Sequence, residues 1–288
     1  MSSPSQLLLQ SLALEKTSEL EFSGRDDGFV LPNPYGGRLL GQAISAAGQT
    51  VSHDRSLHSM HAYFMRTGKR DLPIKYSVQT LRDGGSFSSR RVEATQQDKL
   101  LFACMCGYHT FEPNAEAQLA QMPAVPAPET LQSNEPWPEV THYQNNARTN
   151  PSHPIHSFDL RFTQDEATHA KQSDPDKRQL WVRHVGEQCT AREFESLFGW
   201  FSDFFLLPTV LKPLGVKLGS GQLRIASLDH ALWVHRAFDL NQWLLFDYRC
   251  TVYGYSRAHT EAKIYTQQGS LVASLVQEGL VQVREETA

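Results

Sequence analysis

Long apolar runs, cysteines and a surplus of basic residues are all scarce in this sequence. No run of about 18 apolar residues occurs, and the opening segment MSSPSQLLLQSLALEK has no basic residue ahead of its apolar patch, so neither a membrane span nor a signal peptide is expected. The net charge of −4 and the pI near 6.3 argue against binding to nucleic acid or an anionic membrane. The final residues, REETA, do not form a peroxisomal address.

The cysteines are too few for a disulfide framework and lack the spacing of a zinc site; they are Cys104, Cys106, Cys189 and Cys250. These absences together predict a cytoplasmic protein with no nucleic-acid partner and no membrane insertion. What is present is ordinary for a globular chain, because 40% of the 288 residues are apolar and 20% are charged. A chain of this length predicts one large domain or two modest ones.

Proline divides the chain. Eight of the 15 prolines lie between Pro113 and Pro154, where proline excludes a long helix or a central strand because it lacks an amide donor. We therefore predict an N-terminal module over 1–115, a partly extended proline-rich linker over 116–154 and a C-terminal module over 155–288.

The two halves resemble each other. TQQDKLLFA begins at Thr95 and TQQGSLVAS at Thr266, and each follows an alternating polar run and leads into an apolar one. A single large offset predicts a duplicated domain, since solenoid repeats have periods of about 20–50 residues.

The pattern of the first half predicts one helix followed by four strands. The helix covers Gly37–Val51, where Gly37 and Gly41 share one face and suggest close approach to a sheet. Asp83–Gly85 predicts a turn. The expected strands are Leu57–Met65, Ile74–Leu81, Ser86–Thr95 and Leu100–Thr110.

The second half repeats this order after a strand near Gln179–Val185. A helix is expected from Ala191 to Leu207, because Thr190 and Glu193 have capping-box spacing and Pro208 stops it. The strands expected after it are Leu223–His235, Trp243–Val252, Ala258–Thr266 and Leu271–Val283. A long helix followed by an antiparallel meander, twice over, is typical of helices wrapped by a curled sheet.

Several catalytic signatures are absent: GxSxG, GxxxxGK[ST], GxGxxG after a strand, and HExxH. His58 and His61 lie three apart on a predicted strand, and their side chains therefore face opposite ways. The same argument applies to His230 and His235, which lie five apart on a strand, so no metal site is expected from either pair.

Asp203 and Gln277 are unusual for their surroundings. Asp203 has only uncharged same-face neighbours on its predicted helix, which would raise its pKa, so it is either a base in an apolar cleft or a residue at a gap that water reaches. Gln277 is the one hydrogen-bonding side chain on an apolar strand face, and it either serves a site or binds backbone. Ser227 is a weaker candidate by pattern.

The two halves differ in these polar residues. The helix expected over Gly37–Val51 has no acidic residue, and the first half has only small or apolar residues near Cys104–Gly107, where the second half has Gln277. We therefore expect one polar site per chain.

A family resemblance covers nearly the whole chain, from about residue 30 to 283. It is carried by the blocks PNPYGGRLLGQAI, LHSMHAYFMRTG, TLRDGGSFSSRRVEA, WFSDFFLLP, SLDHALWVHRAFDLNQWLLF and LVASLVQEG, in that order. Together they resemble the acyl-CoA thioesterase II family. The resemblance implies an α+β double hotdog fold, in which each module is a long helix held in a curved antiparallel sheet, and hydrolysis of acyl-CoA to a fatty acid and CoA. It implies no cofactor.

The resemblance also implies the catalytic residues. The aspartate of the family lies in WFSDFF, the hydroxyl before LDH and the glutamine in VQEG, which correspond to Asp203, Ser227 and Gln277. Many relatives carry threonine where this chain has Ser227; the exchange keeps the hydroxyl but loosens its rotamer. The expected mechanism is direct attack by a water that these three residues hold.

The remaining expectations concern substrate contacts, rival functions and assembly. Oxyanion donors are expected at Tyr35-Gly36-Gly37, with Gly36 and Gly37 allowing close approach. Arg90 and Arg91 are candidates for binding the CoA phosphates, although the same pattern is equally typical of a solvated strand edge.

The alternative functions are a hotdog hydratase or dehydratase, a non-catalytic acyl-CoA binder and, more remotely, a serine hydrolase of another fold. Exposed sheet edges predict a homodimer or homotetramer.

Overall fold

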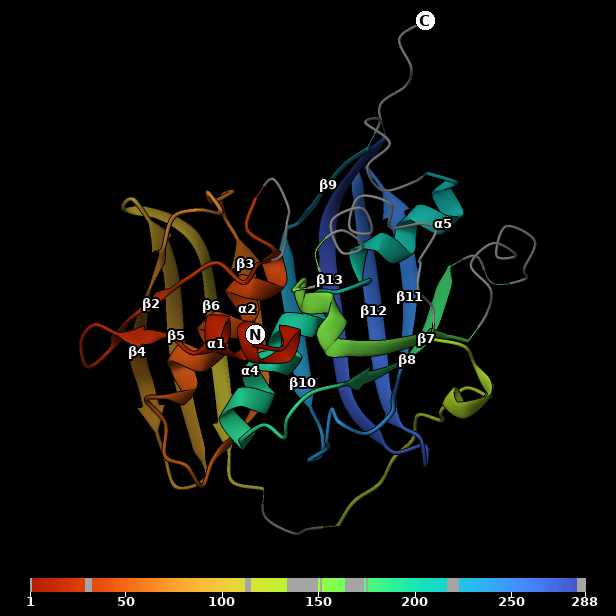
Figure 1. The fold of residues 1–288 in the computed structure, drawn as a ribbon, viewed down its shortest axis with the longest axis horizontal. Helices are drawn as coiled ribbons and strands as arrows, with labels where there is room; N and C mark the ends of the chain where they lie inside the picture. The colour runs from red at the N-terminus through yellow and green to blue at the C-terminus, as the bar shows by residue number, and fades with distance from the viewer. Residues whose placement is uncertain are drawn as a thin grey trace, which may run out of the picture.

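The computed structural model describes residues 2–28, 33–111, 115–133, 150, 152–163, 174, 176–216 and 223–283. Two curved antiparallel sheet halves lie side by side, and the longer helices gather on one face near the middle (Figure 1). This is the α+β arrangement expected from the sequence. No helix in the described ranges is long and apolar enough to cross a membrane.

The first half begins with elements that the sequence pattern did not indicate. These are α1 (Pro4–Leu12), β1 (Glu15–Lys16) and β2 (Glu21–Gly24). The expected helix and four strands follow as α2 (Gly36–Gly48), β3 (Ser56–Phe64), β4 (Ile74–Asp83), β5 (Phe87–Gln96) and β6 (Lys99–His109).

The second half repeats the order of the first. Two short 3₁₀ turns come first, η1 (Pro128–Thr130) and η2 (Pro154–Ser157), followed by β7 (Phe158–Phe162) and β8 (Lys177–His184). Then come α4 (Ala191–Ser202), η4 (Leu207–Val210), α5 (Leu211–Leu214), β9 (Leu223–Ser227), β10 (Asp229–Val234), β11 (Leu244–Gly254), β12 (Arg257–Thr266) and β13 (Leu271–Val283).

One continuous sheet joins the halves. Its order in the described residues is β1-β2-β4-β5-β6-β3-β10-β13-β12-β11-β8-β7, with β9 also on β13. At the centre His61 of β3 pairs with Ala231 of β10, and Met60–Leu232 and Ala62–His230 flank that pair symmetrically. The two halves are therefore related by an internal pseudo-two-fold axis at this pair, as the duplication predicts.

The capping box at the start of α4 is confirmed. The Thr190 side chain accepts from the Glu193 N–H at 3.3 Å, and the Thr190 N–H donates to Glu193 Oε2 at 2.8 Å. The expected end at Leu207 was wrong, because α4 ends at Ser202 and Phe205 has φ 65°. Four consecutive apolar residues follow Asp203, and each is at most 4% exposed. A continued helix would turn one of them outward, so breaking the helix lets all four be buried.

The two helices pack closely through glycine. A β-carbon on Gly41 would lie 2.7 Å from the carbonyl oxygen of Ser196, and one on Gly37 would collide with the carbonyl oxygen of Trp200. The expected close approach to a sheet was therefore wrong, because these glycines face α4. Only a residue without a β-carbon allows the two backbones to come this near.

Two segments outside the repeated modules pack onto the second half. Ser5 of α1 shares a hydrogen bond of 2.8 Å with His184 of β8. Part of the proline-rich region also packs there, since Trp181 donates its indole N–H to Pro126 O at 2.9 Å beside Met122 and Val125. The boundaries 1–115, 116–154 and 155–288 remain a proposal, and residues 134–149 of that linker lie outside the described ranges.

Candidate active site

Three polar side chains meet at the end of α4. Asp203 is the C-cap of that helix, and its Oδ1 accepts from Gln277 Nε2 at 2.6 Å and from Ser227 Oγ at 3.3 Å. Gln277 Nε2 also lies 2.9 Å from Ser227 Oγ. The residues come from α4, β9 and β13, so the structure brings together the three side chains that the sequence singled out.

A strand break positions Ser227. The expected strand over Leu223–His235 was wrong as one element, because it divides at Leu228 into β9 and β10. The Leu228 N–H donates to Glu278 O at 3.0 Å, and Leu228 O accepts from the Phe64 N–H at 2.9 Å. Asp229 Oδ1 also accepts from the Glu278 N–H at 2.7 Å. This irregularity is held by three hydrogen bonds, and it holds Ser227 beside Asp203.

The N-terminus of α2 faces the carboxylate. The backbone N–H of Gly37 donates to Asp203, and a β-carbon on Gly36 would lie only 2.6 Å from Asp203 Oδ2. The N-cap residue, Tyr35, makes no side-chain cap, so it leaves the N–H groups of this helix end unpaired by a cap. Helix N-termini stabilise negative charge. The site therefore combines α2 of the first half with α4, β9 and β13 of the second.

The surroundings of Asp203 act on its pKa in opposite directions. Burial raises the pKa of Asp203, while the hydrogen bonds from Gln277, Ser227 and the Gly37 N–H lower it; burial prevails and the pKa is raised. A raised pKa makes the ionised carboxylate a better proton acceptor than an ordinary aspartate. Gln277 is fully buried, and among the described residues its Oε1 has no hydrogen-bond partner, so that oxygen is an acceptor left open beside the carboxylate.

Comparison with known proteins identifies the family. Residues 155–280 match the family model for acyl-CoA thioesterase, and residues 29–112 match the model for the acyl-CoA thioesterase N-terminal domain. The chain is 32% identical to acyl-CoA thioesterase 2 of Haemophilus influenzae over 96% of its own length and 98% of that protein. The chain belongs to the acyl-CoA thioesterase II family. It is a thioester hydrolase with the double hotdog fold.

Two further relatives span the whole fold. Human acyl-coenzyme A thioesterase 8 is 29% identical over 99% of this chain and 91% of that protein. A crystal structure of an acyl-CoA thioesterase II from Mycobacterium marinum has a TM-score of 0.78 at 29% identity, covering 96% of this chain and 99% of that one. The structural match extends over both halves of this thioesterase.

The two arginines considered for CoA binding lie elsewhere. Arg90 has a side chain only 3% exposed, and it is held by Asp83 at 2.9 Å and by Thr50 O at 2.8 Å. Thr50 follows the C-terminal end of α2, opposite Gly36, so the structure does not bring Arg90 to Asp203. Arg91 is half exposed and pairs with Glu93. Both arginines have carboxylate partners, and neither is placed at the site of this thioesterase.

His230, which the sequence pattern excluded as a metal ligand, lies near the site but not in it. His230 Nε2 shares a hydrogen bond of 3.0 Å with the hydroxyl of Ser202, the residue before Asp203. Complete burial lowers the pKa of His230 to about 3, so its ring is neutral. Within the described residues no hydrogen bond joins His230 to Asp203, and no cluster of side chains there could hold a metal ion.

The pseudo-two-fold axis relates the candidate active site to a second position without its polar residues. The register of the strands makes Leu57 equivalent to Ser227 and Cys106 equivalent to Gln277. Gly48, twelve residues into α2, takes the place of Asp203. The expectation of one polar site per chain is thus met in the described halves of the molecule.

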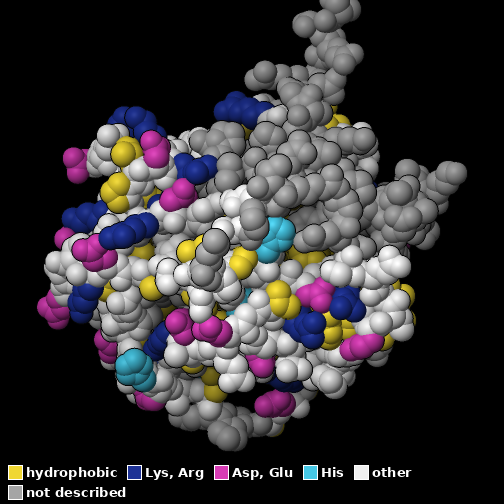
Figure 2. Space-filling model, in the orientation of Figure 1, with side chains coloured by type: hydrophobic (Ala, Val, Ile, Leu, Met, Phe, Trp, Pro, Cys, Tyr) yellow, Lys and Arg dark blue, Asp and Glu magenta, His cyan; other side chains and the backbone are white. Residues whose placement is uncertain are grey.

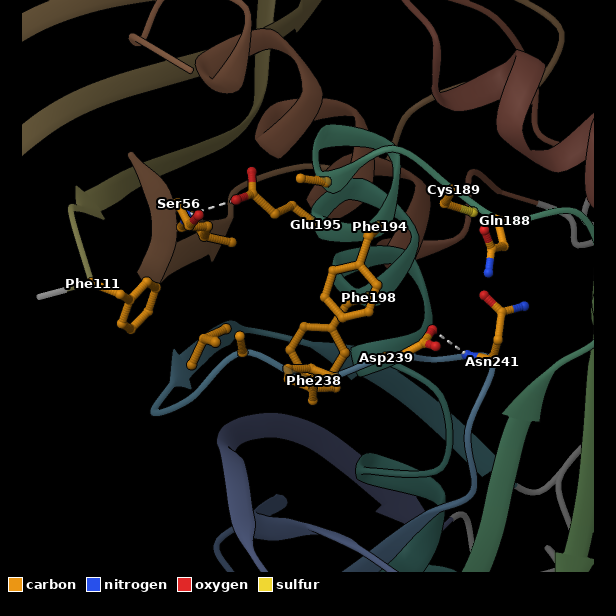
Figure 3. A pocket seen from close by; sticks show the side chains of 14 residues that line it. Ser56, Phe111, Gln188, Cys189, Phe194, Glu195, Phe198, Phe238, Asp239 and Asn241 are labelled. Carbon is orange, nitrogen blue, oxygen red and sulfur yellow. Dashed lines mark hydrogen bonds between the residues drawn. The ribbon is translucent and has the colours of Figure 1, made fainter. Parts of the chain in front are cut away.

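A cavity of about 340 Å³ lies at this second position (Figure 3). The rings of Phe194, Phe198 and Phe238 point toward one another in it. One carboxylate oxygen of Glu195 accepts from the Leu57 N–H at 2.8 Å, and the other accepts from Arg192 at 2.9 Å. Both oxygens of this carboxylate are therefore occupied. The second position has a pocket but no counterpart of Asp203, Ser227 and Gln277.

Proposed function

We propose that this thioesterase hydrolyses fatty acyl-CoA by direct attack of a water held by Asp203, Ser227 and Gln277. The observation that supports this most is the convergence of a buried carboxylate, a hydroxyl and an amide on one point at the N-terminus of α2. A thioester needs no strong protein nucleophile, because thiolate is a good leaving group.

In the proposed reaction, the proton that Asp203 takes from the water is returned to the leaving group. Asp203 accepts a proton from the water as its oxygen bonds to the thioester carbonyl carbon, and the carbonyl π electrons move to the carbonyl oxygen. When that oxyanion collapses, the C–S bond breaks, and the proton on Asp203 passes to the departing CoA sulfur. The products are a free fatty acid and CoA, and Asp203 returns to its ionised form.

Ser227 and Gln277 orient the groups that react. The amide nitrogen of Gln277 donates to Asp203 Oδ1 and so keeps the carboxylate ionised and directed, while its open Oε1 can accept the second hydrogen of the water. Ser227 donates to the same carboxylate oxygen and accepts from Gln277 Nε2, so it fixes the two side chains that would bind the hydrogens of the water.

The first turn of α2 would stabilise the oxyanion. The Gly37 N–H reaches Asp203, and the positive end of the helix would add to the stabilisation of negative charge at this point. Glycine at positions 36 and 37 leaves room for the substrate carbonyl.

The test is CoA release, followed with a thiol reagent across acyl chain lengths, in wild type and Asp203→Asn. We expect kcat/KM to fall by roughly 10²-fold or more, as for loss of a general base. Asp247→Asn is the matched control, because Asp247 of β11 is a partly buried carboxylate that also has a raised pKa, and it is bonded to Gln179 of β8. Equal activity in Asp203→Asn and wild type would remove Asp203 from the mechanism.

Assembly and location complete the proposal. The sheet ends in the edge strands β1 and β7, and its outer surface exposes Tyr63 and Met105 at 61% and 52%. We propose a homodimer or homotetramer, which light scattering after size-exclusion chromatography would test; a monomer at micromolar concentration would contradict it.

The four free cysteines fit a reducing compartment, and we propose that the protein is located in the cytoplasm. A yeast relative is named as peroxisomal, so fractionation must separate these two locations.

A further inference from the structure

The loops that leave the two central strands have the same shape. Residues 65–73 follow β3 and residues 235–243 follow β10, and bends and turns fall at equivalent positions in both. Each loop is held by an equivalent arginine: Arg66 donates to Leu100 O at 3.0 Å, and Arg236 donates to Leu271 O at 3.3 Å. Lys69 in the first loop therefore corresponds to Asp239 in the second.

The first loop borders the Asp203 site. Phe64, which precedes it, has its backbone bonded to Leu228 beside Ser227, and a β-carbon on Gly36 would lie 3.3 Å from the Phe64 ring. A β-carbon on Gly68 would lie 3.2 Å from Pro34, two residues before Gly36. By the same symmetry, Ala237, Asp239 and Asn241 of the second loop line the cavity in Figure 3.

The two loops differ in charge. The first carries three cations, Arg66, Lys69 and Arg70, against one carboxylate, Asp71. Arg70 is neutralised by Asp26 at 2.9 Å. Within the described residues, Arg66 and Lys69 make no ion pair, and both are exposed.

In the second loop, Arg236 is paired with Glu116 at 3.1 Å, and an acid stands where the first loop has lysine. On the face drawn in Figure 2, basic and acidic side chains are interspersed.

We propose that Lys69 binds the phosphate groups of CoA at the mouth of the Asp203 site. The inference rests on the proposed hydrolysis at Asp203. CoA carries its phosphates at the far end of the pantetheine arm from the thioester, and they need cations outside the reaction centre. Lysine presents a compact point charge suited to phosphate, and charge-assisted bonds of this kind are the strong ones.

Comparison of the two loops distinguishes the structural role of Arg66 from the proposed binding role of Lys69. Arg66 makes a loop-holding bond that Arg236 also makes at the position without the hydrolytic residues, so that bond belongs to the fold. The backbone of Lys69 is held by Gln96, with the N–H on Oε1 at 2.7 Å and the carbonyl accepting from Nε2 at 2.8 Å. Within the described ranges its ammonium group makes no hydrogen bond or ion pair, and the equivalent residue in the second loop has the opposite charge.

The experiment compares one acyl group carried on CoA with the same acyl group on N-acetylcysteamine, which has no phosphate. For Lys69→Ala we expect KM for acyl-CoA to rise about tenfold, as for loss of one charge-assisted contact, with kcat within twofold of wild type. Lys69→Glu should raise KM further. Kinetics on the N-acetylcysteamine thioester should not change in either variant. Added salt should raise the wild-type KM for acyl-CoA more than that of Lys69→Ala.

Lys263→Ala is the matched control, because Lys263 is an exposed lysine in β12 of the other half. Equal KM increases on both substrates would assign Lys69 a structural role and overturn the proposal, as would an unchanged KM for acyl-CoA. If wild type turns over neither thioester, the proposed hydrolysis fails instead. Calorimetric titration with CoA would then decide on Lys69, since a wild-type affinity matched by Lys69→Glu would overturn its role.

Discussion

Gly36 faces Asp203 so closely that a β-carbon on the glycine would lie 2.6 Å from the carboxylate Oδ2. The two residues are at opposite ends of different helices, the first residue of α2 and the C-cap of α4, and they come from different halves of the chain. The relationship follows from the close crossing of α2 and α4, which glycine on both helices permits. It places a helix N-terminus and a general-base candidate on either side of one reaction point.

Gly36→Ala should therefore impair catalysis without unfolding the protein. The added methyl group would displace the Asp203 carboxylate from Ser227 and Gln277, and we expect kcat to fall by about 10²-fold, since small misplacements of reacting groups have such effects. Steady-state hydrolysis of acyl-CoA and a thermal melt would measure this. Gly85→Ala is the control, because nothing lies within 4 Å of a β-carbon there. Wild-type kcat in Gly36→Ala would contradict this geometry.

Gln277→Ala should move the acid limb of the pH profile to higher pH. The Gln277 amide donates to Asp203 and lowers its pKa, so removing it raises that pKa further. A base with a higher pKa becomes ionised, and hence active, only at higher pH. The measurement is kcat/KM against pH in both proteins, with a lower maximum also expected because the water loses an orienting partner. An acid limb that stays in place, or moves to lower pH, would show that Gln277 does not control Asp203.

Ser227→Thr should retain activity and Ser227→Ala should lose it. Threonine keeps the hydroxyl that bonds Asp203 Oδ1 and restricts its rotamer, so we expect kcat/KM within a few-fold of wild type. Alanine removes the bond and leaves the carboxylate less well held, with an expected loss of about tenfold or more. Parallel kinetics on one acyl-CoA would test the pair. Similar activity in both variants would mean that the hydroxyl takes no part.

Local pattern was enough for part of this protein. The capping box of Thr190 and Glu193 could be recognised because both partners lie within one turn. Asp203 and Gln277 stood out because a carboxylate or an amide among apolar neighbours is visible from the residues on either side. The duplication was visible in the repeated TQQ segments, and it implied the paired architecture that the strand order bears out.

Other features depended on contacts between residues far apart in the chain. The end of α4 at Ser202 and the break at Leu228 follow from burial and from hydrogen bonds to distant strands, which no local window contains. The same holds for Arg90, whose exposure could not be judged from its strand pattern and which is buried on Asp83 and Thr50.

The sequence by itself therefore determined which residue types were available for chemistry and that two similar modules carry them. Only the tertiary structure decided where they meet. Gly37 and Gly41 read as close-packing residues in the sequence, but their partner is α4, and this helix contact brings Gly36 to Asp203. The correspondence between Lys69 and Asp239, which carry opposite charges, becomes apparent only when the pseudo-two-fold axis superposes the two loops. The physical reason is common to all of these: propensity and patterning act over a few residues, whereas burial and electrostatic environment are set by the whole chain.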